Sequence, residues 1–325
     1  MSLTEDIKHE AIELGFDLVG ITDASPIDAE HVKPLADWLK SGCAGQMSYM
    51  QRNFEKRINP AKLLENAQSV IVVGLNYTPP KRSSSLRASQ SDARQSHLRH
   101  TTAPTGKVAN YAQYEDYHPF VRNELRKLID FISSITSQAH KFKICVDSAP
   151  LAERALAVRA GLGFIGKNHM LINPTLGPQI FLGEIITDLK LQPDESITSN
   201  CLNCDKCIAA CPTGALWPDG RFDANKCISY LTIEYKGQIP PDLVEKIGNR
   251  LFGCDDCITA CPYEEDAPVC KNKQFKFYND RAKLDLRRIL NLTQEYFDAE
   301  FADSPIKRLG LDRLKRNAQI CLANN

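Results

Sequence analysis

The feature that most constrains this chain is a group of closely spaced cysteines, eight of which fall in one short stretch. The first run reads Cys201-x2-Cys204-x2-Cys207-x3-Cys211, followed by proline. In this spacing three thiolates hold one 4Fe-4S cluster and the fourth reaches a second cluster. The stretch therefore predicts two iron-sulfur clusters in a compact module.

The second run has one cysteine fewer than the first, and Cys227 is the candidate for the missing ligand. It reads Cys254-x2-Cys257-x3-Cys261, again followed by proline. If each cluster takes one ligand from the other run, the first cluster is held by Cys201, Cys204, Cys207 and Cys261. The second is then held by Cys211, Cys227, Cys254 and Cys257.

A pair of structural zinc sites is the alternative interpretation, since four cysteines also suit tetrahedral zinc. Zinc ribbons pair two short CxxC hairpins, whereas this chain has a triple run that ends in Cys-Pro. Iron is therefore favoured. Four cysteines have no ligand spacing and are interpreted as ordinary thiols: Cys43, Cys145, Cys270 and Cys321.

The composition indicates a globular protein whose net charge is too small to attract nucleic acid or membrane by itself. Forty basic and forty acidic residues cancel among 325, and 43% hydrophobic residues are enough for a core. The N-terminal segment lacks the apolar core of a signal peptide, and no run of apolar residues is long enough to span a membrane. We expect a cytoplasmic monomer that makes no membrane contact.

Helical and strand patterns alternate before the cysteines, which indicates an α/β domain. Helices are expected over residues 4–14, 32–40 and 151–160. Strands are expected over residues 16–21, 69–75, 142–146 and 180–187. The run 69–75 is apolar on both faces, which is typical of a central strand.

The same patterns divide the chain into three parts. Residues 1–190 form the α/β domain, and its segment 81–107 is rich in Ser, Arg and Gln and is expected to be a mobile basic loop. Residues 191–270 form the two-cluster module of ferredoxin type. Residues 271–325 form a short helical segment.

Two short motifs give only weak signals. Gly161-x-Gly163-x-x-Gly166 matches a nucleotide fingerprint as a string, but it follows a helix rather than a strand. Asp116-x-His118 begins like a cobalamin motif of the mutase type, but valine stands where glycine is needed. His118 is as well explained by a surface or core position as by a ligand role.

Several longer segments resemble the tRNA epoxyqueuosine reductase family, which is similar to reductive dehalogenases. The resemblance covers almost the whole chain. It is carried by residues 57–60, 67–71, 111–118, 146–150, 154–155, 160–168, 183–185, 227–237 and 316–318. Longer members add a helical-repeat tail, so the tRNA contacts of that tail are here either absent or made by residues 271–325.

The resemblance implies a cobalamin, bound base-off without a protein lower ligand, beside two 4Fe-4S clusters. It implies removal of the epoxide oxygen from epoxyqueuosine at the tRNA wobble position, with electrons from an external low-potential donor. In matching segments the residues implied to contact the cobalamin are Arg57, Tyr111, Ala112, Asp147, Leu171, Leu182, Ile185 and Glu234.

Asp147 matches the family's proposed general acid. An acid that works near neutral pH needs a raised pKa, which burial against an apolar corrin face would supply. The competing interpretation is structural, because Asp147 precedes the helix expected over residues 151–160 and could cap it.

Contact with tRNA requires local positive charge on a chain that is neutral overall. The candidates are segment 81–107 and a terminal cluster formed by Lys307, Arg308, Arg313, Lys315 and Arg316. For both, an ordinary solvated basic surface explains the charges as well as phosphate contact does.

Two other functions remain open. A reductive dehalogenase would usually carry a twin-arginine signal, which is missing, and a plain ferredoxin-type electron carrier would not bind a corrin.

Overall fold

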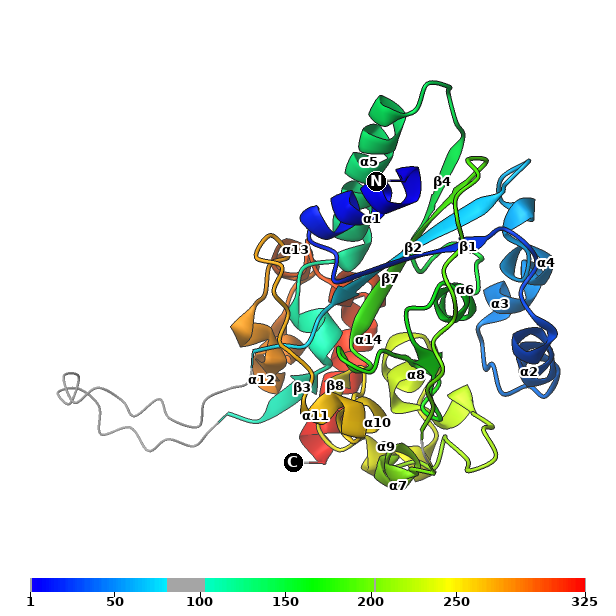
Figure 1. Cartoon of the computed structure of the whole chain (residues 1–325). Coiled ribbons are helices and arrows are strands. Elements are labelled where there is room, and N and C mark those ends of the chain that lie inside the picture. Colours follow the sequence, from blue (N-terminus) through cyan, green and yellow to red (C-terminus); the bar gives the residue numbers. More distant parts are fainter. Residues whose placement is uncertain (1, 81–102, 202, 325) are drawn as a thin grey trace.

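A four-stranded antiparallel sheet in the order β1-β2-β7-β4 forms the centre of the α/β part (Figure 1). The computed structural model describes residues 2–80, 103–201 and 203–324. The strands are β1 (Leu18–Asp23), β2 (Ser69–Asn76), β4 (Phe142–Cys145) and β7 (Ile180–Thr187). All four expected strands are confirmed, and their antiparallel pairing is the new feature.

Helices cover both faces of this sheet. They are α1 (Leu3–Glu13) and α5 (Tyr117–Ile135) on one face and α6 (Glu153–Arg159) on the other. Strand β2 alternates between the two cores: Ile71 and Val73 face α1 and α5, whereas Val70 and Val72 face α6. Complete burial of each such side chain contributes about 1.5–3 kcal/mol. The apolar run in β2 is thus the consequence of two covered faces.

The remaining elements of the first part are short and lie around the α6 side of the sheet (Figure 1). They are α2 (Ala29–Lys40), α3 (Ser48–Arg52), α4 (Phe54–Arg57), the 3-10 turn η1 (Pro60–Lys62), β5 (Phe164–Ile165) and β6 (Leu171–Ile172). Gly163 precedes the β5–β6 hairpin, where a Cβ atom would lie 2.3 Å from the Ile172 carbonyl oxygen. Close backbone packing therefore explains the glycine at this position without a nucleotide.

The cysteine region consists of short helices joined by turns. Its elements are α7 (Lys206–Ala210), η3 (Ala224–Lys226), α8 (Ile228–Ile233), α9 (Pro241–Ile247), β8 (Arg250–Phe252), α10 (Asp256–Thr259) and α11 (Pro262–Glu265). Helices α7 and α10 pack against each other. Each contains the cysteine that lies four residues before the Cys-Pro pair of its run, Cys207 in α7 and Cys257 in α10, so the two runs have matching local structures.

A second sheet, in the order β8-β3-β9, joins all three expected parts of the chain. Strand β3 (Thr105–Val108) pairs in parallel with β8 and antiparallel with β9 (Lys283–Asp285). Gly106 is required here, because a Cβ atom would lie 2.6 Å from Leu251 Cβ. Residues 105–107, expected at the end of a mobile loop, are thus a strand, whereas residues 81–102 lie outside the described residues.

The C-terminal segment is helical, as expected, and packs on the cysteine region. Its elements are η4 (Asn279–Ala282), α12 (Leu286–Asn291), α13 (Gln294–Glu300), η5 (Pro305–Leu309) and α14 (Leu311–Ala323), with η2 (Asn110–Gln113) close to η4. One apolar core holds Leu231, Leu251 and Leu314 together. No helix in the described ranges has both the length and the apolar character needed to cross a membrane.

Candidate cluster sites and active site

The structure gathers the first four predicted cluster ligands at one place. Burial raises the pKa of the Cys207 thiol, and the neighbouring Cys201 and Cys261 raise it further. Burial also raises the pKa of Cys261, next to which Cys201 and Cys204 lie. The backbone N–H of Lys167 donates to Cys201 Sγ at 3.4 Å. These four thiols form a group that matches the first predicted ligand set.

The other four predicted ligands form a second group. Burial raises the pKa of Cys254 to about 12, and the neighbouring Cys227 adds to this effect. Cys227 also interacts with Cys211, and Cys257 interacts with Cys227 and Cys254. Cys257 is in addition close enough to Cys207 for their charges to interact. The two groups therefore lie side by side, and Cys227 lies where the missing ligand is needed.

The donor type of the two groups bears on the choice between zinc and iron. All eight predicted ligands are thiols, which zinc and 4Fe-4S clusters both accept. The two groups lie next to each other, since Cys257 is close to Cys207. Two adjacent groups of four thiols are the arrangement that the ferredoxin spacing predicts for two clusters.

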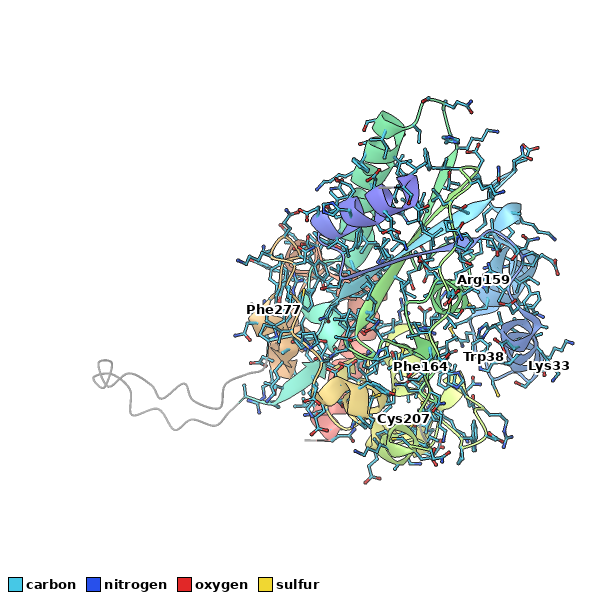
Figure 2. All side chains as sticks on the ribbon, viewed as in Figure 1. Lys33, Trp38, Arg159, Phe164, Cys207 and Phe277 are labelled. Atoms are coloured by element: carbon cyan, nitrogen blue, oxygen red, sulfur yellow. The ribbon has the colours of Figure 1, made fainter. Side chains whose placement is uncertain are left out.

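An apolar cover lies over the first thiol group. Phe164 and Ile172 of the β5–β6 hairpin pack against Cys261, and Tyr263 packs against this group of apolar side chains. Figure 2 shows Phe164 and Cys207 in the same lower part of the molecule. A low dielectric and the exclusion of water tune cluster potentials, so this apolar cover would affect the potential of a cluster bound here.

Asp147 follows strand β4, and its side chain contacts His118 instead of capping the helix that follows. Its backbone is in the left-handed region, with φ at 51°, which costs a non-glycine residue about 1–3 kcal/mol. Helix α6 instead has Ala152 at its N-cap, without a side-chain hydrogen bond. The capping interpretation is therefore wrong. The Asp147 side chain remains 55% exposed, with Oδ2 at 3.0 Å from His118 Nε2.

His118 is the partner that the sequence left ambiguous. It lies in the first turn of α5, is buried, and places Nδ1 2.6 Å from Asp116 Oδ1. Arg308 Nη1 lies 2.9 Å from the same Nε2 that faces Asp147. A protonated Nε2 donates to Asp147, and an unprotonated Nε2 accepts from Arg308. The imidazole thus has a partner in both protonation states.

The protein groups around this pair shift the two pKa values in opposite directions. Although burial opposes the shift, hydrogen bonds to Asp116 and Asp147 raise the pKa of His118. At Asp147 the loss of hydration works against the shift, but the hydrogen bond from His118 and the charge of Arg308 lower its pKa. Both directions favour the proton on His118 rather than on Asp147. The raised pKa expected from burial against a corrin face stays a prediction, and the corrin would have to overcome the effect of His118 and Arg308.

Arg57 and two further groups, Tyr49 and Glu234, lie near Asp147. Arg57 is buried and donates from Nη1 to the Leu151 carbonyl oxygen at 3.4 Å, but its Nε has no hydrogen-bond partner in the part of the chain that the structure describes. Burial and the charges of Glu234 and Asp147 raise the pKa of Tyr49 to about 12. Tyr49 was not predicted, and the two nearby carboxylates place it at this site.

Of the other predicted cobalamin contacts, two lie near Asp147 and the remaining four lie in apolar cores. Burial raises the pKa of Tyr111, and the charges of Asp255, Asp147 and Glu234 act in the same direction, so that Tyr111 and Glu234 are near Asp147. Ala112 is fully buried in the core of the cysteine region. Leu171 and Leu182 share the core beneath α6, whereas Ile185 lies in the core of the opposite sheet face. The structure does not bring the side chains of Leu182 and Ile185 together.

Two residues of the terminal basic cluster are engaged inside the protein. Arg313 donates to the carbonyl oxygen of Ile233, and Arg316 donates to those of Leu231 and Tyr235. These guanidinium groups satisfy carbonyls in and just after α8. Arg313 and Arg316 are therefore neither solvated surface charges nor free phosphate contacts, while Arg308 belongs to the Asp147 site.

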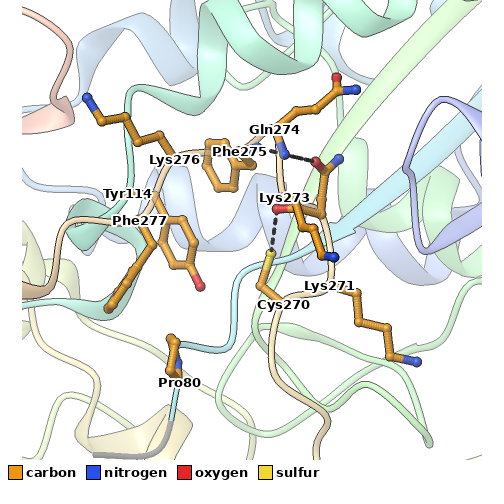
Figure 3. A pocket seen from close by; sticks show the side chains of 10 residues that line it. Pro80, Tyr114, Cys270, Lys271, Lys273, Gln274, Phe275, Lys276 and Phe277 are labelled. Carbon is orange, nitrogen blue, oxygen red and sulfur yellow. Dashed lines mark hydrogen bonds between the residues drawn. The ribbon is translucent and has the colours of Figure 1, made fainter.

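A pocket of about 520 Å³ lies beside the segment that follows the cysteine region (Figure 3). It is lined by Pro80, Tyr114 and residues 270–277, and it contains none of the predicted site residues. Phe275 stacks on Tyr114 with ring centroids 4.8 Å apart. Lys271 and Lys273 are exposed at its rim. The pocket combines an aromatic base with a basic edge.

Family models describe both halves of the chain. A model described as "4Fe-4S double cluster binding domain" matches residues 200–264. The fold and these thiols thus define a two-cluster iron-sulfur redox protein. A second model, "Epoxyqueuosine reductase QueG", matches residues 57–148. With the relatives described next, it shows that the chain belongs to the epoxyqueuosine reductase family.

Three relatives indicate how far this similarity extends. An epoxyqueuosine reductase of Vibrio cholerae is 37% identical and covers 99% of this chain and 83% of its own. A crystal structure of epoxyqueuosine reductase with an epoxyqueuosine-modified tRNA-Tyr stem loop has 33% identity and a TM-score of 0.87. The match covers 99% of this chain and 81% of the other chain. The Bacillus subtilis enzyme, solved with an aspartate catalytic loop swung out of its active site, has 31% identity and a TM-score of 0.86, covering 99% and 81%.

Proposed function

We propose that this chain reduces epoxyqueuosine to queuosine in tRNA. The observation that carries the proposal is the 37% identity over 99% of the chain with an epoxyqueuosine reductase. A relative that holds an epoxyqueuosine-modified tRNA stem loop supports tRNA as the substrate. This proposal takes the place of the dehalogenase and electron-carrier alternatives. Because the substrate is tRNA, we propose that the protein works in the cytoplasm with an external low-potential electron donor.

The reaction sets clear requirements for the site. The reaction consumes the epoxide, two electrons and two protons and yields an alkene and water. The C–O bond at each of the two epoxide carbons must therefore break. When bound, the clusters supply single electrons and a base-off cobalamin supplies the reducing metal centre. The eight thiols fit the clusters, and the unpaired Nε of buried Arg57 offers a donor to a corrin side chain. The Asp147 and Arg57 side chains would face that group.

The proton supply is the part of the reaction that this chain provides directly. The oxygen released by ring opening is a poor leaving group until it is protonated. We propose that Asp147 passes it the proton that His118 holds, through the 3.0 Å contact at Oδ2. Arg308 then donates into the vacated Nε2 position. His118 thus supplies one of the two protons through Asp147, and Arg308 stabilises the neutral imidazole that remains.

The three expected parts of the chain become a division of labour in this proposal. Residues 1–190 would hold the cobalamin and the acid, residues 191–270 the clusters, and residues 271–325 contacts to tRNA. The β8-β3-β9 sheet supports a rigid connection among them, because each part supplies one strand.

Genetic complementation tests the proposed function. In cells that lack their own epoxyqueuosine reductase, this chain should convert the epoxyqueuosine in tRNA to queuosine, as measured by mass analysis of tRNA nucleosides. Unchanged epoxyqueuosine, with full-length protein present and both clusters loaded, would reject the proposal.

Lys271 and Lys273 are predicted to contact tRNA phosphates at the rim of the pocket in Figure 3. Charge reversal at both should lower the salt dependence of tRNA binding, with the slope of log Kd against log salt falling by about 2, because each phosphate contact releases counterions. The control is charge reversal at Lys33 and Lys40 on α2, a helix far from Phe277 in Figure 2. An unchanged slope in the first variant removes this segment from the interface.

His118 should make stability depend on pH. Because the folded state raises its pKa above the ordinary 6.5, its stabilising effect is complete below about pH 6.5 and declines as pH rises through the folded value. In chemical unfolding of His118→Gln, the deficit relative to the unsubstituted protein should therefore shrink above pH 6.5. A deficit that stays constant from pH 5 to 9 would contradict the shift.

A further inference from the structure

A buried carboxyl without an ordinary partner lies in the central sheet next to the Asp147 site. Glu184 in β7 is fully buried, and its strand neighbours are Val72 and Cys145. Neither carboxyl oxygen receives an N–H or O–H from any described residue under standard geometry. A buried ionised carboxylate in such surroundings is strongly unfavourable. Glu184 therefore needs a proton and a neighbour that can accept it.

Glu153 is that neighbour and connects Glu184 to the acid. It lies in the first turn of α6, a helix that packs against β7, and its carboxyl group is close enough to that of Glu184 for the two to interact. Two carboxyl groups can hydrogen-bond only when one of them carries a proton. Glu153 Oε1 also accepts the backbone N–H of Asp147 at 2.5 Å. The chain of contacts runs from Glu184 through Glu153 to the backbone of Asp147.

We propose that Glu153 and Glu184 share one proton and, in this form, hold the Asp147 segment in its catalytic position. The pair is then a positioning device that touches neither substrate nor cofactor. This inference rests on the proposed role of Asp147. It gives the strained left-handed backbone at Asp147 a cause, since the Glu153 carboxylate anchors the N–H of that residue.

The surroundings make the device sensitive to pH. Burial raises the pKa of Glu153 to about 7, and the charge of Asp147 adds to it; burial also raises the pKa of Glu184 well above its ordinary value. The other groups that face the pair are Arg57, Tyr117, Cys145 and Arg154. Loss of the shared proton leaves three carboxylates close together, and their repulsion should release the Asp147 segment.

Two spectroscopic measurements on anaerobically purified, cluster-loaded protein test the proposal. The infrared absorption of a protonated carboxyl should be present at pH 6, titrate near pH 7 and disappear in Glu184→Gln. Hydrogen exchange at the Asp147 amide, corrected for intrinsic rates, should accelerate by roughly fivefold to tenfold above that pH, the effect of losing one hydrogen bond. In Glu184→Gln it should stay slow at every pH, because the amide N–H replaces the shared proton.

Glu153→Ala provides the second variant and Glu124→Gln the matched control. Without the Glu153 carboxylate, the Asp147 amide should exchange fast at all pH values. Glu124 is also a buried carboxyl, but it pairs with Lys127 on α5, so its replacement should alter neither measurement. Unchanged protection of Asp147 in Glu153→Ala, or the same pH dependence in Glu184→Gln as in the unsubstituted protein, would overturn the proposal. Neither readout depends on turnover, so failure here is distinct from failure of the proposed function.

Discussion

Replacing Asp147 with asparagine is expected to slow epoxyqueuosine reduction by about 10²–10⁴-fold, the usual contribution of a positioned acid. The amide keeps the shape of the side chain and can still contact His118 Nε2, but it cannot pass a proton to the departing oxygen. Iron content should remain unchanged, because Asp147 belongs to neither thiol group. Corrin binding should also be retained, because asparagine keeps the size and polarity of the side chain that would face the corrin. The measurement is single-turnover conversion of modified tRNA by the loaded enzyme.

Asp188→Asn is the matched control for that substitution. Asp188 also pairs with a histidine, since its Oδ1 lies 3.0 Å from His140 Nδ1. This pair lies just beyond Thr187, the last residue of β7, whereas Asp147 follows the end of β4 that pairs with Glu184. Its replacement should leave the rate within a factor of about two. Full activity in Asp147→Asn would remove Asp147 from the mechanism, and an equal loss in both variants would indicate general damage.

Replacing Cys227 with serine should remove one cluster, lowering the iron content from about eight to about four atoms per chain and abolishing turnover. Cys227 is the ligand least evident from spacing, and it lies among Cys211, Cys254 and Cys257. Iron analysis and electron paramagnetic resonance of the reduced protein measure the loss.

Cys43→Ser provides the comparison, because Cys43 is a partly exposed thiol outside both groups. It should keep the full iron content. A Cys227→Ser variant that also keeps both clusters with unaltered spectra would show that another residue supplies the eighth ligand.

Local patterns in the sequence predict the strands and the thiols well. Strand β7 begins and ends where the strand expected over residues 180–187 does. Ligand spacing identifies seven of the cysteines, and the one missing ligand of the second run identifies Cys227 as the candidate for the eighth. Helix α5 was not predicted, although Val121, Leu125, Leu128 and Ile132 follow helical spacing. Strand direction could not be predicted, because alternating helices and strands do not fix the pairing.

The active site is harder to predict because its members are distant in sequence. His118 comes from the start of α5, Asp147 from the turn after β4, and Arg308 from a 3-10 turn near the C-terminus. No spacing rule links these three positions. The lowered pKa that the protein groups give Asp147 depends on the convergence of His118 and Arg308, which the sequence around Asp147 does not reveal.

The most direct test of the central claim is anaerobic incubation of the purified chain, loaded with clusters and cobalamin, with a strong reductant and tRNA that carries epoxyqueuosine. Mass analysis of the digested nucleosides should show epoxyqueuosine replaced by a product lighter by one oxygen atom, namely queuosine. Epoxyqueuosine that persists unchanged with a fully loaded and reduced protein would contradict the account.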